Sequence, residues 1–315
     1  MSSDLVLQTH SLGKRYRNRW AVQDVNLTVS RGEVFGFLGP NGAGKSTTIR
    51  MLLSLVAPTS GRVDLFGRPL LNNRNEVLRR VGGLVESADF YSYLSGHRNL
   101  EVVAALTGGV SPGAIEEVLT IVGLEERAGD RVKTYSHGMR QRLGIAQALL
   151  GWPEFIILDE PTSGLDPQGI KEVRELVRRL SREREMTIFL SSHLLNEIEQ
   201  TATNMAIIHE GKVVVQGSVQ DLLSSGNNVV KIEARPIEKA ISVIEGQRFV
   251  QGLKRDGQFL EVKMPLERIN SLNVSLVNAS VEVHALIPRR SLEEYFLSIT
   301  ERASNVEVSS KRPLH

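Results

Sequence analysis

The chain of 315 residues contains no cysteine, and this absence excludes two kinds of structure. Without thiols there is neither a disulfide framework nor a thiolate metal site, a composition that fits a cytoplasmic protein. Long apolar runs are also lacking: no stretch approaches the about 20 residues that span a bilayer, and the opening MSSDLVLQTH does not have the layout of a secretory signal. If this protein serves a membrane, we therefore expect another chain to cross it.

An excess of charge of one sign is missing as well. The chain has 38 basic and 36 acidic residues, a formal net charge of +2, so its overall field does not indicate nucleic acid as a partner. The local basic run KRYRNR, residues 14–19, is interpreted as solvated surface, with contact to anionic lipid as the alternative. The 41% of hydrophobic residues can fill a sizeable core, and this length favours one large domain and one small one.

A phosphate-binding loop is the strongest signal that is present. Residues 39–47, GPNGAGKST, fit the pattern G-x-x-x-x-G-K-[ST] at every required position. They follow an apolar run of strand type at residues 33–38 and precede a run with helical spacing at residues 46–56, which is the order that such a loop requires. A glycine-rich turn with an incidental lysine is the alternative, and this context argues strongly against it.

The chemistry of the loop follows from its residue types. Gly39, Gly42 and Gly44 allow backbone angles and close approaches that a Cβ would block, so successive N–H groups can point at phosphate oxygens. Lys45 would reach the β- and γ-phosphates, and the Ser46 hydroxyl would ligate the Mg²⁺ that bridges them. The sequence therefore predicts a nucleotide and Mg²⁺ bound by Gly39, Pro40, Asn41, Gly42, Ala43, Gly44, Lys45, Ser46 and Thr47.

A second chemical signal lies at the end of a buried-type strand. Residues 154–161, EFIILDEP, place Asp159 and Glu160 at the carboxyl end of an apolar run, where ligands bind in parallel sheets. Asp159 would hold the Mg²⁺ shell, and Glu160 would polarise the attacking water. His193 follows another apolar run, residues 187–192, and could reach the γ-phosphate. Alone, an acidic pair is a common surface feature and a lone histidine is usually structural; the loop upstream makes the functional interpretation the stronger one.

The other elements of the first domain are assigned from periodicity. Strands are expected at residues 5–10, 25–29 and 81–86, a turn and a strand at residues 58–67, and helices at residues 96–106, 112–122, 138–150 and 167–184. Tyr16 precedes the phosphate-binding loop and could stack on an adenine, although a core or surface tyrosine is the better interpretation by residue type alone.

These motifs resemble those of the ATP-binding subunits of ABC transporters, and the resemblance covers roughly residues 4–222. GPNGAGKST corresponds to Walker A, FIILDE to Walker B, SGLD at residues 163–166 to the D-loop, and His193 to the switch histidine. The resemblance implies an α/β fold, a P-loop NTPase of the ABC type, spanning residues 1–224 with a helical subdomain at about 87–150.

Two motifs depart from the common pattern of that family. The signature motif, usually LSGGQ, stands here as YSHGM, with Ser136 and Gly138 kept and with His137 and Met139 changed, and the Q-loop glutamine is replaced by Glu86. Both departures resemble the ABC-2 type exporters, particularly those similar to bacitracin and lantibiotic export proteins. The ATP-cleaving residues are unaffected by them.

The resemblance also implies how such a subunit works. Two subunits enclose two ATP molecules, so Ser136, Gly138 and Asp166 would complete a nucleotide site, Tyr16 would stack on the adenine, and Glu86 would lie close to Mg²⁺ or water. The segment with Phe90, Tyr91 and Tyr93 resembles the part that receives a membrane permease, which places the protein at the cytoplasmic face of the cell membrane. The implied function is ATP hydrolysis that powers export by a separate permease, of an antibiotic, a peptide or a lipid-like substrate.

Two rival functions are considered. A soluble ABC ATPase acting on ribosomes or DNA would resemble two fused cassettes or contain a long coiled coil, and this sequence has neither a second Walker A nor sustained heptads. A non-catalytic regulatory subunit is opposed by the joint presence of Lys45, Asp159, Glu160 and His193. The expected partners are a permease and a second copy of this chain or a related subunit, and no nucleic acid.

A small second domain is expected beyond the linker SSGNN at residues 224–228. Its predicted order is strand 229–234, helix 236–245, strand 248–255, strand 258–263, helix 265–277, strand 281–286 and helix 291–300. Asp256-Gly257 is a hairpin signal, and the order βαββαβ indicates a ferredoxin-like α+β domain over residues 229–300. No catalytic constellation is apparent there, so a dimerisation or stabilising module is favoured over ligand sensing, and the tail 301–315 is predicted to be disordered.

Overall fold

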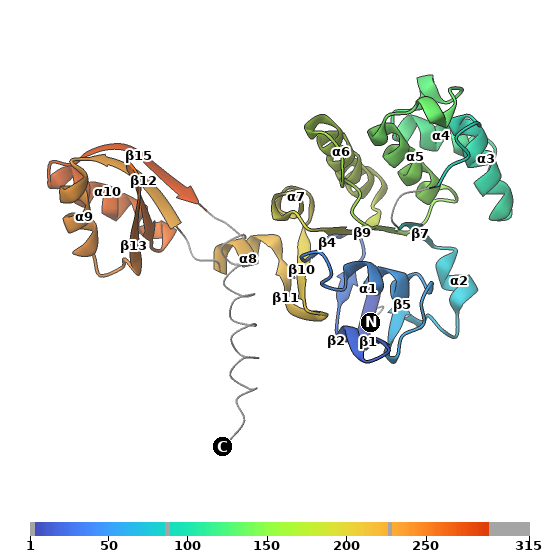
Figure 1. The fold of residues 1–315 in the computed structure, drawn as a ribbon, viewed down its shortest axis with the longest axis horizontal. Coiled ribbons are helices and arrows are strands. Elements are labelled where there is room, and N and C mark those ends of the chain that lie inside the picture. Colours follow the sequence, from blue (N-terminus) through green and yellow to red (C-terminus); the bar gives the residue numbers. More distant parts are fainter. Residues whose placement is uncertain (1–3, 86–88, 226–228, 290–315) are drawn as a thin grey trace, which may run out of the picture. The chain divides into compact units, whose positions relative to one another are not determined.

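The computed structural model describes residues 4–85, 89–225 and 229–289 (Figure 1). The chain forms two compact units, Met1–Val219 and Gln220–His315. Each unit has its own hydrophobic core. The division lies ahead of the expected linker, at the start of helix α8 (Val219–Ser225). Glu86, the helix expected at 291–300 and the tail 301–315 lie outside the described residues.

The first unit is built on a sheet of six strands whose three central strands carry the expected motifs. The strand order is β11-β10-β4-β9-β8-β7, and β11 is antiparallel to β10 while the other neighbours are parallel. The strands are β4 (Val34–Leu38), β7 (Val81–Leu84), β8 (Phe155–Leu158), β9 (Thr187–Ser192), β10 (Asn204–His209) and β11 (Lys212–Ser218). Every residue of β4, β8 and β9 is buried, as expected for parallel strands that are covered on both faces.

The register of these strands brings three sequence motifs to one edge of the sheet. Leu38 pairs with Ser192 at the ends of β4 and β9, and Leu158 pairs with Leu190 between β8 and β9. The carboxyl ends of β4, β9 and β8 are therefore adjacent, and they bring together the loop after β4, the histidine after β9 and the acidic pair after β8. The carboxyl edge of a parallel sheet is where ligands bind in such folds.

A second, antiparallel sheet is formed by the N-terminal residues and the segment after the first helix. Its strands are β1 (Leu5–Tyr16), β2 (Arg19–Val25), β3 (Thr28–Ser30), β5 (Ser60–Leu65) and β6 (Arg68–Pro69). The single strand expected at residues 25–29 is wrong: Val25 pairs with Leu12, whereas Thr28 pairs with Gln8, so two short strands share β1 as their partner. The basic run lies in the hairpin between β1 and β2.

Helices cover both faces of the six-stranded sheet. They are α1 (Lys45–Leu52), α2 (Arg74–Leu78), α3 (Gly96–Leu106), α4 (Ala114–Ile121), α5 (His137–Leu149), α6 (Pro167–Arg184) and α7 (Leu195–Thr201), with 3-10 turns η1 (Glu125–Arg127) and η2 (Val132–Thr134). Helix α1 lies between the two sheets, and α5 and α6 lie on the opposite face (Figure 1). One hydrophobic core joins residues of β1, α1, β4 and β9, among them Leu7, Ile49, Phe35 and Phe189.

The second unit contains a four-stranded antiparallel sheet in the order β13-β14-β12-β15. Its elements are β12 (Val229–Arg235), α9 (Ile237–Glu245), β13 (Gly252–Asp256), β14 (Phe259–Lys263), η3 (Leu266–Arg268), α10 (Ile269–Asn278) and β15 (Glu282–Arg289). This sequence of elements is the βαββαβ order of ferredoxin-like folds. Strand β13 begins later than expected because Val250 N–H turns back to the Gln247 carbonyl, 3.1 Å away. The boundaries of the second domain stay a prediction.

Within the part of the chain that the structure describes, no helix combines the length and the apolar character needed to cross a membrane.

Candidate nucleotide site

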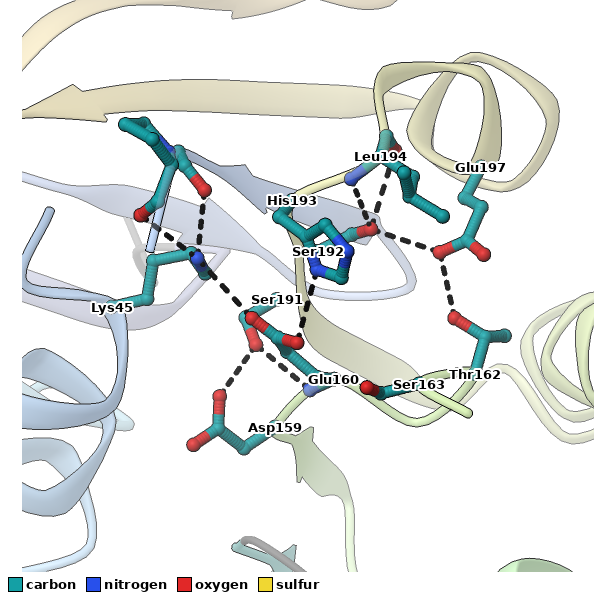
Figure 2. Close-up of polar contacts among 12 residues, drawn as sticks. Lys45, Asp159, Glu160, Thr162, Ser163, Ser191, Ser192, His193, Leu194 and Glu197 are labelled. Atoms are coloured by element: carbon teal, nitrogen blue, oxygen red, sulfur yellow. Dashed lines mark hydrogen bonds and ion pairs between the residues drawn. The ribbon is translucent and has the colours of Figure 1, made fainter. Parts of the chain in front are cut away.

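Lys45, the first residue of α1, is held inside the loop that precedes it. Its side chain is only 4% exposed, and its Nζ donates hydrogen bonds to the carbonyl oxygens of Gly39 at 2.7 Å and Pro40 at 3.2 Å. The same Nζ lies 3.2 Å from Oε1 of Glu160 (Figure 2). The ammonium is thus fixed at the edge of the sheet, where its charge can meet phosphate oxygens.

The glycines of the loop are required for two different reasons. Gly42 and Gly44 have φ angles of 80° and 111°, in the region that L side chains rarely adopt. A Cβ on Gly44 would also lie 2.7 Å from the Ala21 carbonyl oxygen, and one on Gly39 would lie 2.5 Å from that of Ile208. Gly39 and Gly44 are therefore needed not only for the approach of phosphate but also for close packing of the loop against other strands.

The carboxylates after β8 are organised by a buried serine of the neighbouring strand. The Ser191 hydroxyl donates to Oδ1 of Asp159 at 2.6 Å and accepts from the backbone N–H of Glu160 at 2.9 Å. Asp159 is 5% exposed and Ser191 is fully buried. Glu160 itself has a φ of 48°, a left-handed conformation that turns the chain sharply at the strand end. One hydroxyl therefore fixes both acidic residues.

The Glu160 carboxylate lies between a cation and an imidazole. Its Oε1 lies 3.2 Å from Nζ of Lys45, and its Oε2 lies 3.1 Å from Nδ1 of His193, as Figure 2 shows. The side chains of Glu160 and His193 are 26% and 36% exposed, so solvent reaches both. A carboxylate that is oriented from both sides and open to solvent can orient a water molecule for attack.

A cavity of about 530 Å³ opens beside these groups. It is lined by Ser46, His137, Gln141, Asp159, Glu160, Ser163 and Gly164. Ser46 and Asp159 are on its wall, and a hydroxyl with a carboxylate is the kind of oxygen donor pair that a hard divalent cation accepts. The cavity thus combines residues after β4 and β8 with residues of α5.

Other predicted site residues lie at helix ends or on the surface. Ser136 and Asp166 are the N-caps of α5 and α6: Ser136 Oγ accepts from Met139 N–H at 3.2 Å, and Asp166 Oδ1 accepts from Gly169 N–H at 2.9 Å. The ring of Tyr16 is 46% exposed at the end of β1, with Lys14 Nζ 5.3 Å from its centroid. The remaining loop residues, Pro40, Asn41, Ala43 and Thr47, lie where the loop and the start of α1 were expected.

The signature stretch contributes one residue to the cavity beside the phosphate-binding loop of its own chain. His137 lines the same cavity as Ser46, and its Nε2 lies 3.2 Å from the Ser163 carbonyl oxygen. Ser136 and Gly138 are not among the described residues that line that cavity. The predicted phosphate-contacting residues of the stretch are therefore separate from the cavity wall, and Ser136 is exposed.

Sequence reasoning missed several residues of the site. Ser191, Ser192 and Glu197 carry no motif of their own, because their roles depend on hydrogen bonds between segments that are distant in sequence. Gln141 carries none either, and only the fold places it on the cavity wall. For Ser191 and Ser192 a weak signal exists: two hydroxyls end an apolar run directly before His193.

Comparison with known proteins agrees with this geometry. A family model described as ABC transporter matches residues 22–163. The bacitracin transport ATP-binding protein BcrA of Bacillus licheniformis is 41% identical over 297 residues, which cover 93% of this chain and 97% of that protein. The lantibiotic transport ATP-binding protein SrtF of Streptococcus pyogenes is 41% identical over 234 residues, 73% of this chain and 100% of that protein.

A solved structure gives the same assignment for the fold. CbiO1 from Clostridium perfringens, part of the ABC transporter complex cbiONQ, matches with a TM-score of 0.65 at 26% identity, covering 71% of this chain and 92% of that chain. The two sheets, the phosphate-binding loop and the acidic strand end described above are those of a P-loop NTPase of the ABC type. The chain therefore belongs to the ABC transporter family, as an ATP-binding subunit whose ATP hydrolysis is coupled to transport.

Proposed function

We propose that this subunit powers an exporter through the group of Lys45, Glu160 and His193. The observation that carries the proposal is the position of the Glu160 carboxylate, 3.2 Å from Lys45 Nζ and 3.1 Å from His193 Nδ1. In this proposal Glu160 orients and polarises the attacking water, and His193 and Lys45 bind the γ-phosphate from two sides. The buried position of Lys45 strengthens its attraction for phosphate because little water screens the ammonium.

The nucleotide would lie against the N-terminus of α1. The positive end of the helix would face the phosphates there, and the exposed Tyr16 ring would stack on the adenine. Mg²⁺ would be held by the Ser46 hydroxyl and the Asp159 carboxylate, and it would neutralise phosphate charge in the site. Ser191 keeps Asp159 in place for that purpose, since it donates to Oδ1 and leaves Oδ2 available.

The assembly we propose contains two ATP-binding subunits and a permease. Ser136 and the backbone N–H groups at the start of α5 would approach the γ-phosphate held by the other subunit, with Asp166 beside them. A homodimer is favoured because one sequence contains every motif needed for turnover, and a heterodimer with a related subunit is the alternative. No feature of the described site suits a nucleic acid, and the permease would hold the protein at the cytoplasmic face of the membrane.

A pair of exposed tyrosines is the proposed permease contact. Tyr91 and Tyr93 are 53% and 65% exposed, and their ring centroids are 5.9 Å apart. The segment is rigidly presented, because the Asn99 side chain accepts from Tyr91 N–H at 2.8 Å and donates to the Tyr91 carbonyl at 3.1 Å. Tyrosine is one of the residue types that most often contribute a large share of the binding free energy at protein interfaces.

The class of substrate is inferred from the relatives. BcrA is a bacitracin transport protein and SrtF a lantibiotic transport protein, so a peptide antibiotic is the proposed cargo. Co-expression with a candidate permease tests the assembly: the subunit should co-purify with it, and Tyr91→Ala/Tyr93→Ala should release the subunit while its own ATP turnover persists. Leu106→Ala is the matched control, an 82% exposed apolar residue of α3. Equal retention of the tyrosine variant and the control would contradict the proposed contact.

A further inference from the structure

A buried carboxylate follows the histidine of the site. Helix α7 begins just after His193, and its first turn carries Glu197, which is 8% exposed. Its Oε2 accepts two hydrogen bonds, from the Thr162 hydroxyl at 2.6 Å and from the Ser192 hydroxyl at 2.8 Å (Figure 2). The two donors come from different segments of the chain.

The two segments are those that carry the facing groups of the site. Thr162 follows Glu160 by two residues, and Ser192 directly precedes His193. The hydroxyl of Ser192 also accepts from Leu194 N–H at 2.9 Å, which fixes the turn around the histidine. The Glu197 carboxylate is thus a link between the backbone after Glu160 and the backbone at His193.

The surroundings of Glu197 are not those of a group that only stabilises the fold. Its Oε1 has no hydrogen-bond partner among the described residues, and neither has Nε of Arg174, which lines the same small cavity. Burying a charge with incomplete pairing opposes stability, and apolar residues of the same volume would serve a core at least as well. Arg174 belongs to α6, and its Nη1 donates to the Gln200 side chain of α7.

We propose that Glu197 is a positioning residue that sets the relative placement of Glu160 and His193 by holding Thr162 and Ser192 together. It touches no substrate and acts through the two hydroxyls. With Glu197 in place, the Glu160 carboxylate and the His193 imidazole keep their 3.1 Å contact. This inference rests on the roles proposed for Glu160 and His193.

The test is steady-state ATP turnover together with ATP affinity in single and paired variants. Glu197→Ala should lower kcat about tenfold to a hundredfold, the range typical of residues that orient metal ligands from the outer shell, while the ATP Kd changes less than about threefold. Thr162→Val, which removes the hydroxyl at nearly constant shape, should lower kcat as well, and Thr162→Ser should restore it. Because both act through one hydrogen bond, Glu197→Ala/Thr162→Val should be no slower than Glu197→Ala alone.

The control is Asn196→Ala, an exposed position of the same helix, which should leave kcat unchanged. If Glu197→Ala does not fold, Thr162→Val and Ser192→Ala test the inference instead. Each should lower kcat, and the double variant should lose less than the product of the two single losses. Normal kcat in the Glu197 variant, additive effects, or failure of Thr162→Ser to restore turnover would overturn the inference. Normal ATP turnover in Glu160→Gln would overturn both the proposed site and this inference. If Glu160→Gln loses turnover while Glu197→Ala keeps it, only this inference is overturned.

Discussion

Nδ1 of His193 lies 3.1 Å from Oε2 of Glu160, although the two residues follow different strands of the sheet. Strands β8 and β9 are parallel neighbours, so residues just beyond their carboxyl ends come together without any local sequence relationship. The contact joins the proposed water-orienting group to the proposed phosphate-binding group. It predicts that the two side chains act as a unit.

Substitutions of this pair should therefore not be additive. Glu160→Gln and His193→Ala should each lower ATP turnover by about 100-fold or more, and the double variant should be little slower than the worse single variant. Turnover is measured by phosphate release, with thermal melting curves to confirm that the variants fold. Lys45→Ala serves as comparison, since it should lose ATP affinity in addition to turnover. Multiplied losses in the double variant would show that the contact has no role in catalysis.

Ser191 provides a prediction in which stability and turnover change together. Ser191→Ala leaves the Asp159 Oδ1 and the Glu160 N–H without their buried partner, so unfolding should become easier by about 1–3 kcal/mol. Turnover should fall as well, because both acidic residues lose their orientation. Ser181→Ala is the control: its hydroxyl donates to the Gly32 carbonyl at 3.3 Å at the opposite edge of the sheet, so turnover should be unchanged. Equal turnover in the two variants would contradict the positioning of the carboxylates by Ser191.

The acid stability of the first unit should depend on Glu154 at the amino end of β8. Hydrogen bonds from Arg80 at 2.5 and 2.9 Å, and from Arg31 at 2.9 Å, lower the pKa of Glu154 from 4.5 to about 2. A lowered folded-state pKa stabilises the fold above the unfolded value, and that stability is lost as the pH falls from 4.5 toward 2. The carboxylate is 37% exposed, so after solvent screening we expect a contribution of about 1 kcal/mol or less.

The measurement compares the natural chain with Glu154→Gln in urea at several pH values. The difference in unfolding free energy should be constant from neutral pH down to about 4.5 and should vanish by about 2. Trp20 and Trp152 both lie in the first unit, so their fluorescence reports on that unit. A difference that grows as the pH falls would contradict the assignment, and ATP turnover at neutral pH should be unaffected.

How much of this site could be predicted depends on whether a signal is local. The loop at 39–47, the pair Asp159 and Glu160, and His193 each belong to a short pattern at the end of a buried run, so the sequence located them and their elements. Ser191 and Glu197 could not be assigned in this way, because their hydrogen-bond partners become neighbours only when β8, β9 and α7 pack together. Glu86 lies outside the described residues, so its proposed role stays a prediction.

The fold shows the same limit at β10 and β11, which the sequence analysis did not identify. These strands form a hairpin whose two loop residues, Glu210 and Gly211, have φ angles of 48° and 79°. Asn-Gly or Asp-Gly is the usual signal for such a turn, and glutamate at the first position hides it. The buried run Met205–Ile208 was too short to separate strand from helix by periodicity alone. Tertiary pairing with β4 settles it as a strand.

The start of α5 provides the last prediction, which concerns the proposed dimer. Ser136 is exposed and caps only the Met139 N–H, and the first N–H groups of a helix have no partner within the helix. In saturating ATP, Glu160→Gln should bind without cleaving and should accumulate a dimer, which light scattering detects as a doubled mass. Adding Ser136→Arg should keep the protein monomeric, because a bulky cation would occupy the place of the nucleotide phosphate at the interface.

Ser136→Ala in the same Glu160→Gln background is the matched control, since it loses the same helix cap, a cost of about 1 kcal/mol, without adding bulk. It should still dimerise at saturating ATP, with a higher ATP concentration at the midpoint because one hydrogen bond to phosphate is missing. If the alanine and arginine variants behave alike, loss of the cap rather than obstruction explains the result. A Glu160→Gln protein that stays monomeric in ATP, or an arginine variant that dimerises as well as its parent, would contradict a nucleotide site shared between two subunits.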